Sequence, residues 1–353
     1  MSDFRTISGI ILNEYKCVHL YANNEKKNGH DWILKITEFP RGIKKIKNLF
    51  ELLEKYPRID TLMLNPKKFS LLQLKAFEKA WVENATIKNC IVSTIGSSIE
   101  KKDSFVKLLD VVLSRQLLSL KLIDIDIDKC IEDRICDYID KNPDLKGFGF
   151  KHCKYQKTLF NVISSMDNLT HLEMIGTDKS GSKDVLSGLA NYITDLSKIT
   201  HLDIQEIYLS SENCTAITDV IKKCKSLKVL SLAMYGWWTL ETITCLGDAL
   251  IQNSTLEELE LRGSTVPCSV IKLLYGNLKR LNLKKCSLKS AQLSELALVV
   301  SHKTEPFILN LDDNYATLDD INLFNLVRDL NPGVEVKIPS TTITPMPSLT
   351  RLM

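Results

Sequence analysis

The sequence predicts an α/β solenoid, a fold in which one strand and one helix repeat along the chain. Three observations predict it. The apolar spacing L-x-x-L-x-L, with Ile, Val, Met, Phe or Cys also accepted, recurs through most of the 353 residues. Its copies begin roughly every 22 to 30 residues, a length typical of one strand plus one helix. Amphipathic segments of about three helical turns lie between the copies. No unit of this size can bury its own apolar face, so the units must stack.

The strands are placed by the spacing itself. Its fourth and sixth residues point inward with the period of two that marks a strand. The complete copies are Ile59/Leu62/Leu64, Ile87/Cys90/Val92, Leu117/Leu120/Leu122, Leu145/Phe148/Phe150, Leu169/Leu172/Met174, Ile199/Leu202/Ile204, Leu227/Leu230/Leu232, Leu256/Leu259/Leu261 and Leu278/Leu281/Leu283. Weaker copies stand at Leu34/Ile36, Leu309/Leu311 and Val334/Val336.

The helices fill the intervals between these strands. The pattern predicts helices over residues 70–81, 103–113, 184–192, 240–251 and 318–330. The intervals that begin at Leu145 and Leu256 are the shortest, and we expect shortened helices there, for example over residues 270–274. Stacked units of this kind place a parallel sheet on an inner wall and the helices outside it.

These spacings resemble the ribonuclease-inhibitor-like class of leucine-rich repeats over about residues 30 to 338. The resemblance implies a right-handed, horseshoe-shaped solenoid of about eleven units. It also implies Asn or Cys at the ninth position of each unit, where the side chain hydrogen-bonds the turn after the strand. The sequence departs from this pattern in several units. It has Cys153, Cys286 and Asn314 at that position, but Thr177, Ile207, Tyr235 and Ser264 elsewhere.

Both ends of a solenoid need a cap, because a terminal unit would otherwise expose its core. Alternation at Val18 and Leu20, followed by a polar turn over residues 23–29, predicts a hairpin cap within residues 1–30. The solenoid then covers residues 31–338 and ends on a strand after the helix-stopping Asn331-Pro332-Gly333. Residues 339–353 are rich in Pro, Ser and Thr, so we expect a flexible tail.

Composition limits the partners and the compartment. With 46 basic and 43 acidic residues, the net charge of +3 implies no overall attraction to nucleic acid or anionic lipid. No apolar run is long enough for a secretory signal or a membrane span.

The ten cysteines lack paired spacings, so we expect buried, reduced thiols. These features favour a cytoplasmic protein, or one secreted by a non-classical route. The N-glycosylation sequons at Asn84, Asn168, Asn213 and Asn253 are then expected to carry no glycan.

Residues at positions three, five, seven and eight of each unit are expected to project from the inner wall. They predict a polar face with an acidic middle and a basic patch that contains Arg262, Lys284 and Lys285, with Lys279 and Arg280. Such a patch suits an acidic partner or a phosphate backbone. Because no aromatic side chains are interleaved for base stacking, the pattern argues against nucleic acid. A solvated face remains the alternative.

An aromatic segment leaves the strand of the Leu227 unit. Met234, Tyr235, Trp237 and Trp238 lie next to the small residues Ser231 and Ala233. Exposed Trp and Tyr side chains are typical of interface hot spots, so we predict a partner-binding rim here. The alternative is that these side chains cover the adjoining helix, with one of the three aromatics packed inward.

Two neighbouring strands carry nearly the same tetrapeptide. Register predicts that His171 and Glu173 lie beside His201 and Asp203. Imidazoles and carboxylates in one patch suit a divalent metal or a carboxylate with a raised pKa. Related units also place like residues side by side without any such role. We prefer a partner contact or solvated ladder, and we assign no metal or cofactor.

No signature of catalysis is recognisable: the sequence has no phosphate-binding glycine loop, zinc-protease motif or nucleophile elbow. The sequence therefore predicts a non-enzymatic scaffold that binds a protein through the inner face and the aromatic rim. Two alternatives stay open. One is a regulator of another enzyme, either a GTPase activator or a ubiquitin-ligase substrate receptor. The other is a microbial effector that binds a host protein. The identity of the partner and the oligomeric state stay open as well.

Overall fold

The computed structural model describes residues 11, 18–22, 32–40, 42–65, 69–94, 102–154, 163, 166–176, 198–208, 210–235, 238–266, 270–274 and 276–338. The chain divides into two compact units, Met1–Leu169 and Thr170–Met353. Each unit is described by itself. Strands and helices alternate in both units, which confirms the predicted α/β fold.

The first unit opens with a hairpin and continues as a parallel sheet. β1 (Val18–Ala22) pairs antiparallel with β2 (Trp32–Ile36), where the alternation at Val18 and Leu20 places a strand. β2 then pairs parallel with β3 (Ile59–Leu64), and the sheet continues in chain order through β4 (Asn89–Ser93), β5 (Ser119–Ile123) and β6 (Gly147–Lys151). β2 therefore belongs both to the hairpin and to the repeating sheet.

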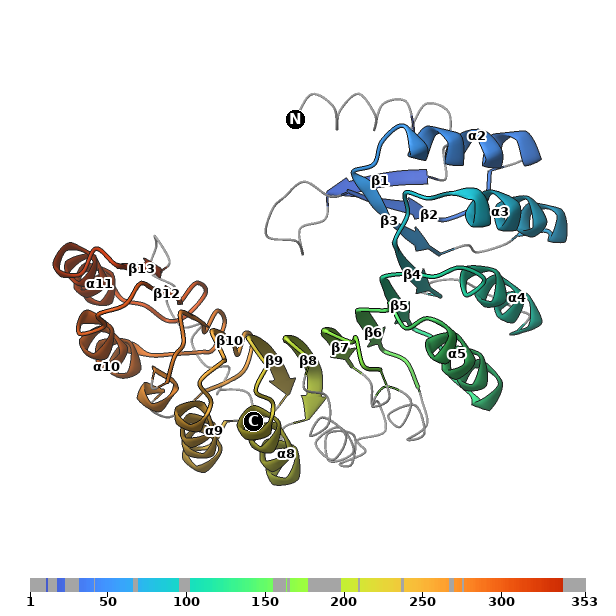
Figure 1. Ribbon diagram of the computed structural model, residues 1–353. Coiled ribbons are helices and arrows are strands. Elements are labelled where there is room, and N and C mark those ends of the chain that lie inside the picture. The colour runs from blue at the N-terminus through green and yellow to red at the C-terminus, as the bar shows by residue number, and fades with distance from the viewer. Residues whose placement is uncertain are drawn as a thin grey trace, which may run out of the picture. The chain divides into compact units, whose positions relative to one another are not determined.

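The helices of the first unit lie along one side of its sheet (Figure 1). They are α2 (Ile43–Glu54), α3 (Leu71–Glu83), α4 (Lys102–Val112) and α5 (Lys129–Lys141). An aromatic cluster fills the space around α2 and α3. The ring of Phe77 lies 4.9 Å from that of Phe39 and 5.7 Å from those of Phe50 and Trp81, measured between centroids. The strand side of this core is supplied by the fully buried Leu62 and Leu64.

The second unit repeats the same arrangement without a hairpin among its described residues. β7 (His171–Ile175), β8 (His201–Tyr208), β9 (Val229–Tyr235), β10 (Glu258–Glu260), β11 (Arg280–Asn282), β12 (Phe307–Asn310) and β13 (Val334–Lys337) pair parallel in chain order. α8 (Ser211–Lys223), α9 (Leu240–Gln252), α10 (Ser290–Ser301) and α11 (Leu318–Leu330) lie on one side of these strands (Figure 1). The helix expected over residues 184–192 lies outside the described residues.

Short side chains determine where several helices begin. Ser70, Ser210 and Thr317 precede α3, α8 and α11, and each side chain accepts a hydrogen bond from the backbone N–H three residues later. This satisfies a donor that the first helical turn would leave unpaired. In the shortened unit after β10, the predicted helix is a single 3-10 turn, η1 (Ile271–Leu274).

Buried asparagines mark the ends of several helices. Asn253 follows α9, and its Oδ1 accepts hydrogen bonds from the backbone N–H groups of Thr255 (2.8 Å) and Leu256 (2.7 Å). Asn84 makes the same contacts after α3, with Thr86 and Ile87. Asn84 and Asn253 belong to sequons, and so does the equally buried Asn213; each of the three is 2% exposed. Their burial closes them to glycosylation in the folded chain.

The last described strand has a capped edge. The Arg328 guanidinium reaches from α11 to the backbone carbonyl of Val336 at 2.6 Å, and the Val334 N–H donates to the Asn331 carbonyl at 3.0 Å. These contacts satisfy backbone groups that an edge strand would leave open. The tail predicted over residues 339–353 lies outside the described residues.

The prediction of buried thiols is only partly right. Cys90, Cys153, Cys214, Cys224 and Cys286 are buried, whereas Cys130 and Cys245 are exposed and Cys136 is half-buried. Helical periodicity explains the two exposed thiols, since they lie on the outward faces of α5 and α9. No helix in the described parts of the chain is long and apolar enough to cross a membrane.

Candidate functional site

Several repeats share one backbone conformation where the strand ends, although Thr94 at position eight of the β4 repeat does not adopt it. At position eight, φ is positive in residues of every type: Asp124 (60°), His152 (53°), Gly176 (53°), Glu206 (58°), Gly263 (76°), Lys285 (59°) and Asp313 (59°). The N–H of this residue donates to the position-seven carbonyl of the next repeat. These bonds measure 2.9 Å from Gly263 to Lys284 and 3.0 Å from Lys285 to Asp312. Position seven is therefore fixed at the end of each strand.

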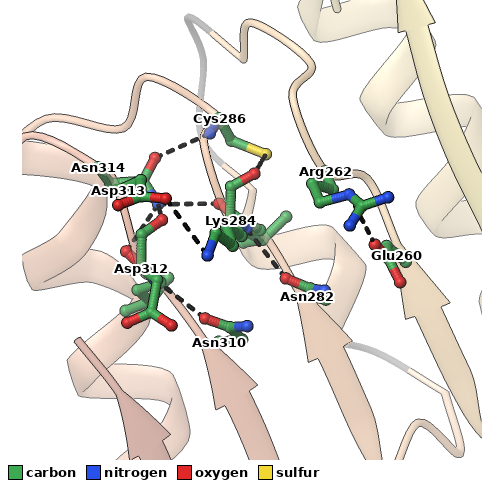
Figure 2. Close-up of polar contacts among 11 residues, drawn as sticks. Glu260, Arg262, Asn282, Lys284, Cys286, Asn310, Asp312, Asp313 and Asn314 are labelled. Atoms are coloured by element: carbon green, nitrogen blue, oxygen red, sulfur yellow. Dashed lines mark hydrogen bonds and ion pairs between the residues drawn. The ribbon is translucent and has the colours of Figure 1, made fainter. Parts of the chain in front are cut away.

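The ninth position makes the hydrogen bonds that the resemblance implies. Asn314 Oδ1 accepts from the backbone N–H groups of Cys286 and Leu288, both at 3.0 Å. Its Nδ2 donates to the carbonyls of Leu283 (2.8 Å) and Leu311 (2.9 Å), as part of the network in Figure 2. The Cys286 thiol donates to the Leu261 carbonyl at 3.1 Å, and burial raises the pKa of that thiol to about 12. Both side chains are structural and hold the strand face in place.

The prediction of a purely basic patch is wrong, because acidic side chains lie among its Lys and Arg residues. Arg262 lies 3.2 Å from Glu260 on β10, and Lys284 lies 3.3 Å from Asp313 in the following turn (Figure 2). Lys279 and Arg280 likewise face Glu257 and Glu258, at 3.1 Å and 3.9 Å. The partners of Lys279, Arg280 and Lys284 come from the neighbouring repeat, whereas Glu260 lies two residues before Arg262 in the same repeat. Lys285 is exposed in the turn after β11, where its backbone N–H donates to the Asp312 carbonyl.

A second polar row lies at position five of β11 and β12. Asn282 and Asn310 are register partners on these neighbouring strands. Each Oδ1 accepts from the backbone N–H two residues later, at 3.1 Å from Lys284 N and 3.0 Å from Asp312 N. The two carboxamides are held in the same orientation, with their nitrogens pointing the same way in Figure 2. Sequence reasoning placed both residues on the face but assigned them no role.

The histidine patch forms as predicted from register. His171 pairs with His201 and Glu173 with Asp203 between β7 and β8. The imidazole rings stack at 4.1 Å between centroids with an angle of 13° between planes. The hydroxyl of the preceding threonine lies 2.8 Å from Nδ1 of His171 and 2.9 Å from Nδ1 of His201.

The environment of His171 favours its neutral ring. Burial of its stacked face, and then the neighbouring His201, lower the pKa of His171 to about 4. Asp203 is engaged by Gln205, whose amide donates to both carboxylate oxygens at 2.8 Å. Within the described ranges, no group of three or more His, Cys, Asp or Glu side chains is arranged to hold a metal ion. At neutral pH His171 therefore presents a flat, uncharged ring.

Trp238 does not belong to an exposed rim. Its side chain is 1% exposed, and its backbone N–H donates to the Thr265 carbonyl of the next repeat at 3.1 Å. The indole is part of the core, where a large aromatic side chain contributes most by burial. Met234 and Tyr235 end β9. Their side chains, and all of Trp237, lie outside what the structure describes.

The strand face of the first unit is different in character. Its polar side chains hydrogen-bond one another across β3, β4 and β5. Thr61 donates to Asp60 at 2.7 Å, Asn89 to Asp60 at 3.0 Å, and Ser119 to Asn89 at 2.8 Å. At position seven, Asn65, Ser93 and Ile123 are buried. This face offers a partner fewer accessible groups than that of the second unit.

Comparisons with known proteins agree with this architecture. The structure is similar to that of the Rad7 and Elc1 complex in yeast, with a TM-score of 0.52 and 14% identity over 88% of this chain and 78% of that one. In the TLR13–ssRNA13 complex, 79% of this chain matches 38% of the other at 14% identity, with a TM-score of 0.44 that is too low to carry an argument. No family model matches.

One curated relative shares part of the sequence. The human NACHT, LRR and PYD domains-containing protein 13 is 27% identical over 171 residues, which cover 46% of this chain and only 16% of that protein. The repeat spacing, the parallel strands with helices on one side, and these similarities together show a leucine-rich-repeat protein.

Proposed function

We propose that the chain is a non-enzymatic scaffold that binds a protein through the strand face of the second unit. One observation carries the proposal. Positions three, five and seven of β7 to β12 are half-exposed or exposed almost throughout and present both charges, amides and imidazoles from a rigid sheet. Parallel strands hold these rows at a spacing of about 4.8 Å, so the pattern is preorganised for recognition.

The charge arrangement supports a protein partner rather than a nucleic acid. Binding to a phosphate backbone depends on Lys and Arg side chains that exchange counterions for phosphates. On this face Arg262 and Lys284 already have carboxylate neighbours within 3.3 Å. Interspersed charges of both signs are typical of surfaces that select one protein partner by complementarity. The similar Rad7 structure is itself a complex with another protein, Elc1.

The aromatic segment extends this proposed surface. Tyr235 is the last residue of β9 and Trp237 follows two residues later in the sequence, shortly after the half-exposed Ser231 and Ala233. We include these two aromatics as candidate anchors and exclude the buried Trp238. We also assign the chain to the cytoplasm, a proposal supported by free thiols at all eight cysteines in the described parts of the chain.

Affinity purification followed by mass spectrometry identifies the partner, and paired charge reversals then test the face. Arg262→Glu combined with Lys284→Glu should abolish capture, because each change places a carboxylate beside an existing one. The control is Lys75→Glu with Lys79→Glu on the exposed face of α3, which should leave capture unchanged. If the face variant melts like the parent chain and still captures every partner, the proposed surface is wrong.

A further inference from the structure

We infer that Asn282 and Asn310 form a subsite for a carboxylate side chain, an Asp or Glu of the protein partner. The inference rests on the proposed function and names the chemistry of one contact within it. It begins with the hydrogen bonds of the two amides. Because each Oδ1 is held by a backbone N–H of its own strand, each Nδ2 lies on the opposite side of its amide, and the two Nδ2 atoms point the same way (Figure 2).

The spacing of the two amides favours an inserted group. Asn282 and Asn310 are register partners on adjacent parallel strands, which lie about 4.8 Å apart. That separation exceeds a direct hydrogen bond between the side chains. A carboxylate placed over the two strands can accept from both nitrogens, because its two oxygens carry about four lone-pair sites. A cationic group finds no such complement in a pair of N–H donors.

Charged side chains of both signs surround the two amides. Arg280 and Asn282 on β11, and Lys284 two residues after it, occupy alternate positions along the chain. No carboxylate lies between them in the sequence. The carboxylates lie to either side, with Glu258 and Glu260 on β10 and Asp312 after β12. Lys337 is the register partner of Asn310 on β13 and adds a cation beyond it. Each of these three cations also lies within 3.9 Å of a carboxylate, in the pairs Arg280–Glu258, Lys284–Asp313 and Lys337–Glu335, so the amides are the uncharged donors of this part of the face.

Flanking ion pairs restrict the size of the charged group that fits. Arg262 is directed to Glu260 at 3.2 Å, and Lys284 to Asp313 at 3.3 Å. These carboxylates would repel a large polyanion that extends along the row. A single carboxylate contacts only the amide donors of β11 and β12. The subsite is thus matched to one acidic side chain in a partner whose adjacent residues are neutral or basic.

The test uses the full chain and a matched pair of peptides. Acetyl-Ala-Glu-Ala-amide is titrated against the isotope-labelled protein, and the side-chain amide signals of Asn282 and Asn310 are followed by NMR. We expect saturable shifts with an affinity on the order of millimolar, as suits one exposed contact. The Gln peptide should be at least about tenfold weaker. Equal responses to the Glu and Gln peptides, a stronger response to inorganic phosphate, or no response to any probe would each overturn the carboxylate assignment.

Isosteric variants provide the second readout. Asn282→Asp keeps an oxygen that accepts from Lys284 N but replaces the outward donors by a negative charge. The Glu peptide should then bind at least about tenfold more weakly. Asn322→Asp, on the exposed face of α11, is the matched control and should not change binding. An unchanged backbone spectrum shows that the fold is intact, and undiminished binding by Asn282→Asp would contradict the inference.

The two proposals fail in distinguishable ways. If the captured partner is lost on Arg262→Glu with Lys284→Glu but is retained by Asn282→Asp and Asn310→Asp, the binding face stands and the carboxylate subsite is wrong. If the paired charge reversal has no effect on the partner while the peptide titration succeeds, the subsite exists and the assignment of the partner to this face is wrong.

Discussion

At the scale of the residue, position eight has a positive φ in seven of the described repeats. A positive φ there turns the chain from strand to helix and aligns an N–H with the next repeat. Gly176 and Gly263 adopt this conformation without strain, whereas Glu206 and Lys285 adopt it with side chains that disfavour it by roughly 1 kcal/mol or more. The strain persists because the hydrogen bond to the next repeat and the packed strands fix the turn.

Replacing Lys285 by Gly should therefore stabilise the second unit by about 0.5 to 1 kcal/mol, even though glycine usually destabilises. Calorimetry of the melting transition measures the change. Lys225→Gly is the control, because Lys225 is also exposed but its φ is not positive, and it should lose stability. A lower melting temperature for Lys285→Gly would show that the strain is absent.

Asn314 is predicted to be among the least replaceable polar residues of the second unit. Its carboxamide serves two donors and two acceptors in the buried turn around Cys286. Asn314→Ala leaves these groups without partners and should lower the free energy of unfolding by roughly 3 kcal/mol or more. The exposed Asn322→Ala on α11 should change it by less than about 0.5 kcal/mol. Urea unfolding followed by circular dichroism compares the two variants.

The stacked histidines predict a pH dependence of stability. The pKa of His171 is about 4 in the folded chain and near 6.5 when unfolded, so between these values the unfolded chain binds more protons. Stability is then complete above pH 6.5 and declines as the pH falls toward 4. Partial exposure of the ring screens the effect, which should be about 1 kcal/mol or less. His171→Gln should show a shallower decline of melting temperature between pH 7 and pH 5; an identical decline would exclude His171 as its source.

At the scale of elements, the shortened repeat is held by a close approach between η1 and α9. A Cβ added at Gly247 would lie 2.7 Å from Cβ of Lys272 and 3.0 Å from its carbonyl oxygen. Ala is normally better than Gly inside a helix by about 1 kcal/mol. Here the clash reverses the sign, and Gly247→Ala should destabilise the chain by roughly 1 to 3 kcal/mol. Gly333→Ala, whose new Cβ makes only an ordinary contact, is the control in the same melting experiment.

The sequence pattern predicted elements better than it predicted contacts. Leu62, Leu64 and their counterparts at positions four and six are buried because period two admits no other assignment on a one-sided sheet. The helix over residues 318–330 was also predicted with its observed bounds. The Arg262–Glu260 pair and the orientation of the Asn282 and Asn310 amides depend on side-chain rotamers. One-dimensional periodicity carries no information about these, and Trp238 was misplaced for the same reason.

At the scale of the molecule, the two compact units are chemically distinguishable by their thiols. Cys90 and Cys153 are buried in the first unit, and Cys214, Cys224 and Cys286 in the second. Burial raises the pKa of Cys153 and Cys286 to about 12 and that of Cys214 to about 11, so these thiols carry almost no thiolate at neutral pH. Each buried thiol reacts only when the structure around it opens.

We therefore predict stepwise labelling of the native chain by a thiol reagent in increasing urea. Among the cysteines in the described ranges, the exposed Cys130 and Cys245 should react first without urea. Since solenoids are stabilised by local interfaces, the units need not open together, and the buried thiols of each unit should become reactive at a midpoint of their own. Peptide mapping by mass spectrometry assigns each labelled residue. Lys285→Gly, a change in the second unit, should raise the midpoint of Cys286 and leave that of Cys90 unchanged. A common midpoint for all buried thiols, shifted equally by that substitution, would show that the chain unfolds as one cooperative body.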